Sequence, residues 1–199
     1  MQLKAENLGF RYGQEPWLFT DVNLAVEPGE IVGLTGPSGC GKSTLCRIVA
    51  GYEKPLVGRV LIDGESVGNH RIHPVQLVFQ HPEKAVNPKW KMHQILHEGW
   101  KPDNEILEVL GIQQEWMGRR PSELSGGELQ RFCIARALGP STRFLIADEM
   151  TTMLDAITQA QIWNAVLNIA KKREIGIIIV SHEPNLIRRL CKRVLDWKS

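Results

Sequence analysis

The stretch that decides the fold is Gly36-Pro37-Ser38-Gly39-Cys40-Gly41-Lys42-Ser43-Thr44, which matches the pattern GxxxxGKS in full. It follows an apolar run that predicts a strand, and it opens a segment up to Ala50 that predicts a helix ended by Gly51. In such a loop the glycines let the backbone curl, so that N–H groups converge on phosphate oxygens in front of a helix N-terminus. All nine residues are therefore expected to bind the phosphates of a nucleotide.

Two side chains of this loop have more specific expected roles. Lys42 is expected to reach the outer phosphates, and the hydroxyl of Ser43 is placed to ligate Mg²⁺. The alternative is a glycine-rich turn with an incidental lysine. The predicted strand before the loop and the predicted helix after it favour phosphate binding.

Strand-like and helix-like segments alternate on both sides of the loop. Strands are predicted at 2–12, 22–35 with a turn at 27–29, 59–62, 75–79, 144–148, 176–181 and 193–197, and helices at 126–138 and 158–172. This alternation predicts an α/β fold with a mostly parallel sheet covered by helices. From residue 82 to about 124 the β-branched runs give way to helical patterns around 92–96 and 105–110, which indicates an inserted helical subdomain.

A second chemical motif is acidic. The apolar strand predicted at 144–148 runs into Asp148 and Glu149, so both carboxylates would lie at the C-terminal edge of the sheet, where open α/β sheets bind ligands. Asp148 is suited to hold Mg²⁺, and Glu149 to polarise a water for attack on the γ-phosphate. The alternative is that the two acids merely end the strand in solvent.

A third motif, Leu124-Ser125-Gly126-Gly127-Glu128-Leu129-Gln130-Arg131, narrows the family. With it the sequence resembles the nucleotide-binding subunits of ABC transporters, whose LSGGQ signature stands between a Q-loop and the acidic strand. The resemblance covers nearly the whole chain. It implies that Tyr12 stacks on adenine, that Gln80 is the Q-loop glutamine with catalytic and Mg²⁺-binding roles, that Asp155 is the D-loop aspartate at the nucleotide, and that His182 is the catalytic switch histidine.

The resemblance also implies the architecture. The expected fold is a P-loop NTPase core of the RecA-like kind, with a mostly parallel sheet, an antiparallel N-terminal β part and the inserted helical subdomain. Residues 1–199 are expected to form a single ATPase domain. Within it, 1–80 and 131–199 would make the nucleotide-binding core, and 81–130 the helical subdomain with the signature.

The chain carries two phosphate-binding faces, because Ser125, Gly126 and Gly127 open a helix as the first loop does. In the family, two chains form a head-to-tail dimer in which each ATP lies between one chain's phosphate loop and the partner's signature. The resemblance therefore implies ATP and Mg²⁺ as cofactors, and a homodimer or a heterodimer with a second ABC ATPase. It further implies permease subunits and an extracytoplasmic solute-binding protein as partners.

Two segments differ from the family pattern. Glu128 replaces the usual glutamine of the signature, and residues 150–155 read MTTMLD where the family usually has PTSALD.

Residues 78–82 and Ala85-Val86-Asn87-Pro88 are similar to those of the ATPases that energise dipeptide, oligopeptide and nickel importers. The expected function is therefore ATP hydrolysis that energises an importer of peptides, nickel or metal chelates.

Two other functions remain open. A soluble ABC ATPase that acts on nucleic acid or on ribosomes would share these motifs. However, an ATPase that acts on DNA would interrupt the core with a long coiled coil, and one that acts on ribosomes would carry two sets of the motifs. A nucleotide-binding regulator without turnover is supported only by the altered residues 150–155. Steady-state ATP hydrolysis distinguishes the regulator from the other two.

The composition limits the remaining possibilities. Lys and Arg number 24 against 22 Asp and Glu, and a net charge of +2 does not favour nucleic acid by bulk electrostatics, so no direct nucleic-acid partner is expected. The apolar runs are far shorter than the ~20 residues that cross a bilayer, and the first residues do not resemble a signal peptide. We therefore expect a peripheral protein at the cytoplasmic face of the membrane, with its four cysteines reduced.

Some residues outside the motifs have a structural and a functional interpretation. His93 and His97 beside Glu98 form a possible metal face, although surface or packing histidines explain it better. The basic run at 188–193 fits a solvated helix end better than phosphate binding. The tryptophans of the helical segment fit either core packing or a groove for a membrane subunit. Cys40, close to Lys42 and a helix N-terminus, is expected to react faster than a buried cysteine.

Overall fold

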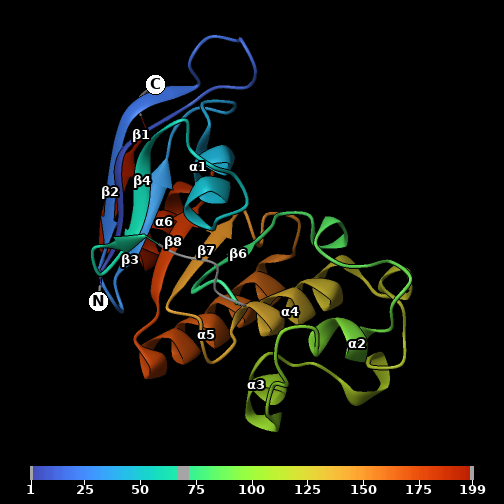
Figure 1. Ribbon diagram of the computed structural model, residues 1–199. Helices are drawn as coiled ribbons and strands as arrows, with labels where there is room; N and C mark the ends of the chain where they lie inside the picture. The colour runs from blue at the N-terminus through green and yellow to red at the C-terminus, as the bar shows by residue number, and fades with distance from the viewer. Residues whose placement is uncertain (1, 67–71, 198–199) are drawn as a thin grey trace.

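Two β-sheets of different kinds form the centre of the structure, a computed structural model that describes residues 2–66 and 72–197. The larger sheet is parallel, in the order β6 (Val75–Val78), β7 (Phe144–Asp148), β8 (Gly176–Val180), β3 (Ile31–Thr35) and β9 (Arg193–Asp196). The smaller sheet is antiparallel, in the order β2 (Phe19–Val26), β1 (Leu3–Phe10), β4 (Val57–Ile62) and β5 (Glu65–Ser66) (Figure 1). The expected parallel sheet and antiparallel N-terminal part are confirmed.

The central strands of the parallel sheet are buried on both faces, which explains their continuous apolar runs. Every residue of β7 and of β8 is buried, and the two strands pair from Phe144 opposite Gly176 to Asp148 opposite Val180. Glycine is required at position 176, since a Cβ there would lie 2.6 Å from the Phe144 ring. Alternate side chains along these strands enter two separate apolar cores.

One core lies between the parallel sheet, the antiparallel sheet and helix α1 (Lys42–Val49). Leu3 and Leu8 of β1 belong to this core together with Leu45 of α1 and with Ile146 and Ile178 of the parallel sheet. Six of the eight residues of α1 are buried. This packing fixes the loop before α1 over the C-terminal edge of the parallel sheet.

The second core joins the opposite face of the parallel sheet to helices α4 (Gly126–Ala137), α5 (Ala156–Arg173) and α6 (Pro184–Leu190). The inserted segment adds α2 (Met92–Leu96), α3 (Asn104–Val109) and the 3-10 helices η1 (Pro82–Lys84), η2 (Gln114–Trp116) and η3 (Pro121–Glu123). Helix α2 packs on α4 through the same core, and Figure 1 shows α2 and α3, in green, beyond α4 from the sheets. The expected boundary between residues 130 and 131 falls inside α4, a continuous helix.

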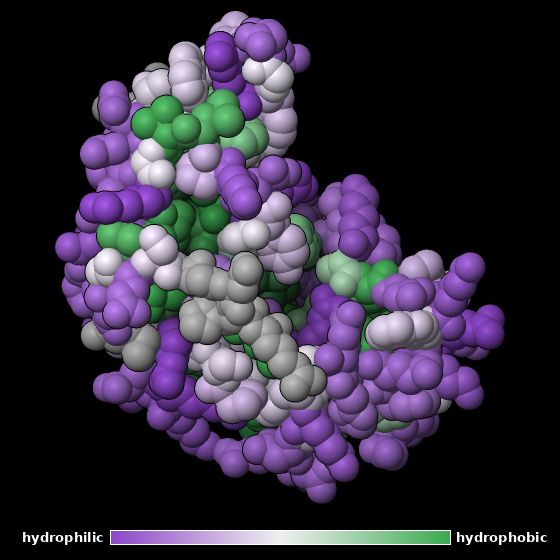
Figure 2. All heavy atoms as spheres, in the orientation of Figure 1, coloured by the Kyte–Doolittle hydropathy of each residue, from purple (hydrophilic) through white to green (hydrophobic). Residues whose placement is uncertain are grey.

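The face shown in Figure 2 is mostly hydrophilic, and its apolar side chains gather on the lobe of the antiparallel sheet and α1. The molecule is hollowed between this lobe and the lobe that contains α2 and α3. In the part of the chain that the structure describes, every helix is too short or too polar to cross a bilayer.

Element boundaries differ from the expected ones at a few places. The segment 22–35 divides between the two sheets: β2 starts at Phe19 and ends at Val26, and β3 begins at Ile31 in the other sheet. Pro28 and Gly29, with φ of 67° at the glycine, turn the chain between them. The short strand β5 was not predicted, and helix α6 was expected only as the helix end at the basic run 188–193. The helix begins with a proline, a favourable first residue.

Candidate nucleotide-binding and hydrolysis site

Four neighbouring strands bring the motif residues to one edge of the parallel sheet. Gln80 follows β6, Glu149 follows β7, His182 follows β8, and the phosphate-binding loop, residues 36–44, follows β3. Because these strands are parallel, their C-terminal ends lie at the same edge. The sheet topology therefore gathers residues that are far apart in the sequence.

Lys42 is held inside the phosphate-binding loop. Its side chain is buried, and its Nζ donates to the carbonyl oxygens of Gly36, at 2.8 Å, and Pro37, at 2.7 Å. Gly41 before it has a φ of 98°, a left-handed conformation that glycine adopts at little cost, and a Cβ there would lie 2.9 Å from Leu18. The loop thus presents an ammonium group at the start of α1, where phosphate oxygens can replace the two carbonyls as acceptors.

A cavity of about 330 Å³ opens beside this loop. Its lining combines most of the predicted phosphate-binding residues with an aromatic ring and two of the predicted catalytic residues: Tyr12, Leu18, Ser38, Gly39, Gly41, Lys42, Ser43, Thr44, Glu149 and His182. The hydroxyl of Tyr12 lies 3.0 Å from that of Thr44, and its ring packs edge-on against Phe10. Tyr12 is 45% exposed as a residue, so its aromatic side chain is accessible to a nucleotide base.

The carboxylate of Glu149 is held on both sides. Gln80 Nε2 donates to its Oε2 at 2.9 Å, and His182 Nε2 lies 3.0 Å from its Oε1. Glu149 also has a φ of 51°, a rare conformation for a residue with a side chain, and its N–H donates to the carbonyl of Val180. The three predicted catalytic residues therefore form one hydrogen-bonded group.

Asp148 and Ser43 form a pair of oxygen donors at the bottom of the site. The Ser43 hydroxyl hydrogen-bonds the Asp148 carboxylate, which is 8% exposed. Burial raises the pKa of Asp148, the charge of Glu149 raises it further, and the Ser43 hydrogen bond opposes the shift. A divalent cation on these oxygens would favour the charged carboxylate and so offset the effect of burial, and the donor set therefore fits Mg²⁺.

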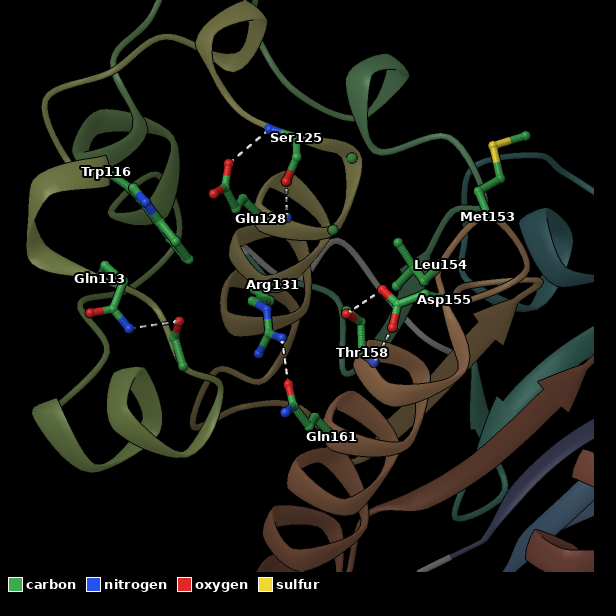
Figure 3. A pocket seen from close by; sticks show the side chains of 13 residues that line it. Gln113, Trp116, Ser125, Glu128, Arg131, Met153, Leu154, Asp155, Thr158 and Gln161 are labelled. Atoms are coloured by element: carbon green, nitrogen blue, oxygen red, sulfur yellow. Dashed lines mark hydrogen bonds between the residues drawn. The ribbon is translucent and has the colours of Figure 1, made fainter.

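A second cavity, of about 600 Å³, contains the predicted signature residues and the predicted D-loop aspartate (Figure 3). It lies between the start of α4 and the start of α5, and its lining includes Ser125, Gly126, Gly127 and Asp155. None of the residues that line the first cavity lines this one. Within the described chain, the predicted residues that line a cavity thus divide between two separate cavities, while Gly36, Pro37 and Cys40 line neither of them.

Both helices at this second cavity begin with a side-chain cap. Ser125 Oγ accepts from the N–H of Glu128 at 3.3 Å, while the Glu128 carboxylate accepts from the N–H of Ser125 at 2.8 Å, which is a complete capping box. Asp155 accepts from the N–H groups of Ile157 and Thr158 and from the Thr158 hydroxyl, and these bonds lower its pKa. The carboxylate of Glu128, which replaces the family's glutamine, is therefore occupied in capping helix α4 of its own chain.

The chain matches a known protein family over most of its length. The model of the family described as "ABC transporter" matches residues 19–152, which include the phosphate-binding loop, the signature and the acidic strand. The chain belongs to the ABC transporter family. Its members with these motifs are ATPases, and the expected enzyme class is confirmed.

Similar ABC ATPases occur among nickel importers. The chain is 33% identical over 201 residues to the nickel import ATP-binding protein NikE of Shigella boydii, which covers 92% of this chain and 75% of that protein. It is also 33% identical over 213 residues to the nickel import system ATP-binding protein NikE of Staphylococcus aureus, with 98% and 86% covered.

Solved structures of ABC cassettes share the fold. The ATP-binding cassette MJ0796, in a dimeric post-hydrolysis state bound to ADP and phosphate, has a TM-score of 0.81 and 26% identity, with 98% of this chain and 94% of that chain covered. CbiO1 of Clostridium perfringens, part of the transporter complex cbiONQ, has a TM-score of 0.80 and 27% identity, with 98% and 84% covered.

Two residues that contact the phosphate-binding loop or the predicted catalytic segments were not predicted from the sequence. Trp197, directly after β9, donates its indole N–H to the carbonyl of Cys40 inside the phosphate-binding loop. Gln130, in the signature helix α4, donates to carbonyls next to Gln80 and next to Glu149. Gln130 belongs to the quoted signature segment, but nothing in the sequence shows where its side chain points.

The residues with two interpretations are also placed by the structure. In the described chain no three His, Cys, Asp or Glu side chains form a group that could hold a metal, and His93 instead contacts the carbonyl of Met117 through Nδ1. The four cysteines are free. Burial raises the pKa of Cys46, and it raises the pKa of Cys133 and of Cys191 to about 11.

Proposed function

We propose that this ABC ATPase is the energising subunit of a multisubunit membrane importer whose cargo is nickel, a metal chelate or a peptide. The observation that carries the proposal is its similarity to two nickel import proteins over more than nine tenths of the chain, at 33% identity. The segments after β6 that resemble peptide and nickel importer ATPases support it independently.

In the proposed reaction, different residues in and around the first cavity bind the nucleotide and activate the attacking water. Lys42 and the loop N–H groups bind the phosphates, and Tyr12 stacks on the adenine. Glu149 polarises the attacking water, with its carboxylate oriented by Gln80 and His182. Water positioned in this way attacks the γ-phosphate in line with the leaving oxygen.

Ser43 and Asp148, together with Gln80 after β6, would hold Mg²⁺. When bound, the ion would neutralise negative charge on the phosphates. The carboxylate of Asp148 is buried and its pKa is raised, which is the condition in which a carboxylate gains most from a cation.

The second cavity supports the dimer part of the proposal. Ser125, Gly126 and Gly127 begin a helix whose N–H groups suit a phosphate, yet the phosphate-binding loop of the same chain lies in another cavity. A second ABC ATPase, either the same chain or a related one, would supply the missing nucleotide. Met153 and Ile157, which flank Asp155, are 65% and 73% exposed and would contact that second chain.

A groove of about 470 Å³ supports the permease part of the proposal. It lies between the segment after α1 and the inserted helical segment, and it combines exposed aromatic surface with an ion pair. Tyr52 is 59% exposed and packs edge-on against Phe79, and Arg136 Nη1 lies 3.0 Å from Glu98. An amphipathic segment of a permease at the cytoplasmic membrane face would fill this groove.

The test is uptake in cells that lack the gene for this chain. We expect the parental gene to restore uptake of radioactive nickel, a nickel chelate or a labelled peptide, and the Glu149→Gln gene to fail. Tyr52→Ala should reduce uptake more than it reduces ATP hydrolysis by the purified chain. If loss of the gene leaves uptake of all three cargoes unchanged, and DNA or ribosomes stimulate ATP hydrolysis by the purified chain, the soluble alternative replaces the proposal. If the purified chain binds ATP without hydrolysing it, the result favours a regulator.

A further inference from the structure

The side chain of Gln130 connects three motifs of the site. Its Nε2 donates to the carbonyl oxygen of Phe79 at 3.1 Å and to that of Met150 at 2.9 Å. Phe79 directly precedes Gln80, and Met150 directly follows Glu149. The amide therefore ties the backbone beside one catalytic residue to the backbone beside another.

These two catalytic residues are themselves bonded. Gln80 Nε2 donates to Glu149 Oε2 at 2.9 Å, so the segments at 79–80 and 149–150 are joined twice: once through their side chains and once through the amide of Gln130. A closed ring of hydrogen bonds restricts both segments more than a single bond would. The position of the Glu149 carboxylate thus depends on a residue that does not touch it.

The amide of Gln130 is buried and only partly satisfied. The residue is 1% exposed, and among the described residues its Oε1 has no hydrogen-bond partner. A buried acceptor without a donor costs free energy, whereas the Nε2 group supplies a donor to two backbone carbonyls. What the amide adds is a fixed distance between two backbone segments.

Gln130 also belongs to the helix that carries the signature. Helix α4 runs without interruption from Gly126 to Ala137, and Ser125 caps it five residues before Gln130. Because a helix moves as a rigid element, a displacement of the signature end would move the Gln130 amide with it. The second cavity and the hydrolysis residues of the same chain are thus mechanically connected.

We propose that Gln130 is a positioning residue, which holds Gln80 and Glu149 in register for hydrolysis and couples them to the signature helix. The proposal rests on the roles proposed above for Gln80 and Glu149. It makes Gln130 important for turnover and unimportant for ATP binding, since Gln130 is not among the residues that line the nucleotide cavity.

The test compares Gln130→Met, which keeps the length of the side chain and removes both donors, with Ile134→Val. Ile134 is fully buried one turn further along α4, so its variant controls for loss of packing in the same helix. We expect Gln130→Met to lower kcat about tenfold with KM for ATP changed less than twofold. Ile134→Val should change neither constant more than twofold.

A double-mutant cycle gives the second readout. If Gln130 acts through Gln80, Gln130→Met should reduce kcat less than threefold in a Gln80→Ala background. The inference is overturned by a parental kcat in Gln130→Met, by an equal loss in Ile134→Val, or by a full tenfold loss in the Gln80→Ala background. A folded Gln130→Met protein that does not bind ATP would also overturn it. If Gln130→Met does not fold, Gln130→Asn takes its place, because the shorter amide cannot reach both carbonyls and should slow turnover in the same way.

Glu149→Gln is measured alongside these variants. If it hydrolyses ATP at the parental rate, the proposed role of Glu149 fails, and the positioning role fails with it. If it stops hydrolysis while Gln130→Met remains fully active, only the inference about Gln130 fails.

Discussion

The indole N–H of Trp197 donates a hydrogen bond of 2.7 Å to the backbone carbonyl of Cys40. The backbone N–H of the same residue donates to the carbonyl of Thr35, also at 2.7 Å, and its ring packs edge-on against Phe19. One residue at the end of β9 therefore holds the phosphate-binding loop both at its start and in its middle.

Trp197→Phe should weaken ATP binding. Phenylalanine keeps the ring contact but leaves the buried Cys40 carbonyl without its donor, which costs about 1–3 kcal/mol. We expect KM for ATP to rise about threefold to tenfold and the melting temperature to fall by about 2–12 °C. Trp90→Phe, at a more exposed tryptophan outside both cavities, is the control and should behave like the parent. Unchanged KM and melting temperature in Trp197→Phe would show that the bond is dispensable.

Lys42→Ala and Glu149→Gln should separate binding from hydrolysis. Lys42 supplies the charge that meets the phosphates, so its loss should abolish nucleotide binding. Glu149→Gln should bind ATP normally, lower kcat by at least about 100-fold and accumulate an ATP-bound dimer, detected by size-exclusion chromatography. Hydrolysis at the parental rate in Glu149→Gln would remove Glu149 from its proposed role.

Ser125→Arg should abolish hydrolysis while ATP affinity of the isolated chain stays nearly unchanged, because the signature residues lie in a different cavity from the phosphate-binding loop. A mixture of Ser125→Arg and Lys42→Ala chains should recover part of the activity, since each mixed dimer contains one intact composite site. Neither variant alone should do so. Complete inactivity of the mixture, under conditions in which mixed dimers form, would argue against shared sites.

Cys40 should be the first cysteine to be alkylated. The sequence suggests an accessible thiol, but Cys40 is itself buried, so the prediction rests on its charged neighbour and not on exposure. Its Sγ lies 3.7 Å from Lys42 Nζ at the start of α1, whereas burial raises the pKa of Cys46, Cys133 and Cys191 and keeps those thiols protonated. We expect alkylation at pH 8 to inactivate the enzyme, with Mg-ATP slowing the loss and Cys40→Ser resisting it. Peptide mapping after partial labelling checks the site. Modification of Cys191 first, without protection by nucleotide, would contradict the prediction.

Asp148→Asn should stabilise the nucleotide-free protein. Since the folded pKa of Asp148 is raised, its charged form costs stability at neutral pH, and this cost disappears as the pH falls through the folded pKa. We expect the variant to melt about 2–4 °C higher at pH 7.5, with a smaller difference at pH 5, and to lose hydrolysis. Asp103→Asn, at the exposed cap of α3, should change neither property. An Asp148→Asn protein that melts below the parent at pH 7.5 would contradict the assignment.

The local motifs made the central part of the fold and the candidate site predictable. Residues 36–44 and 144–149 contain both the chemistry and the strand that precedes it, so a parallel sheet with phosphate and acidic residues at one edge follows from short segments. The predicted roles of these residues stay predictions until the variants above are measured.

The remaining features depend on contacts between distant segments. Trp197 and Cys40 are 157 residues apart, and Gln130 is 51 residues from Phe79, so no local pattern relates them. The use of Glu128 as a capping residue is visible only because its carboxylate turns back to Ser125. The boundary expected at residue 130 also falls inside a helix, because α4 packs against the sheet and against α2 at once.

The position of β8 between β7 and β3 determines the width of the site. Neighbouring strands lie about 4.8 Å apart, so the phosphate-binding loop and the acidic residues start from strands roughly 9–10 Å apart. If β7 and β3 were direct neighbours, the gap would shrink by half, and a phosphoryl group with its attacking water would not fit between lysine and carboxylate. The order of strands therefore sets the distance between the phosphate-binding loop and the acidic residues, and substitutions in the loops leave that order unchanged.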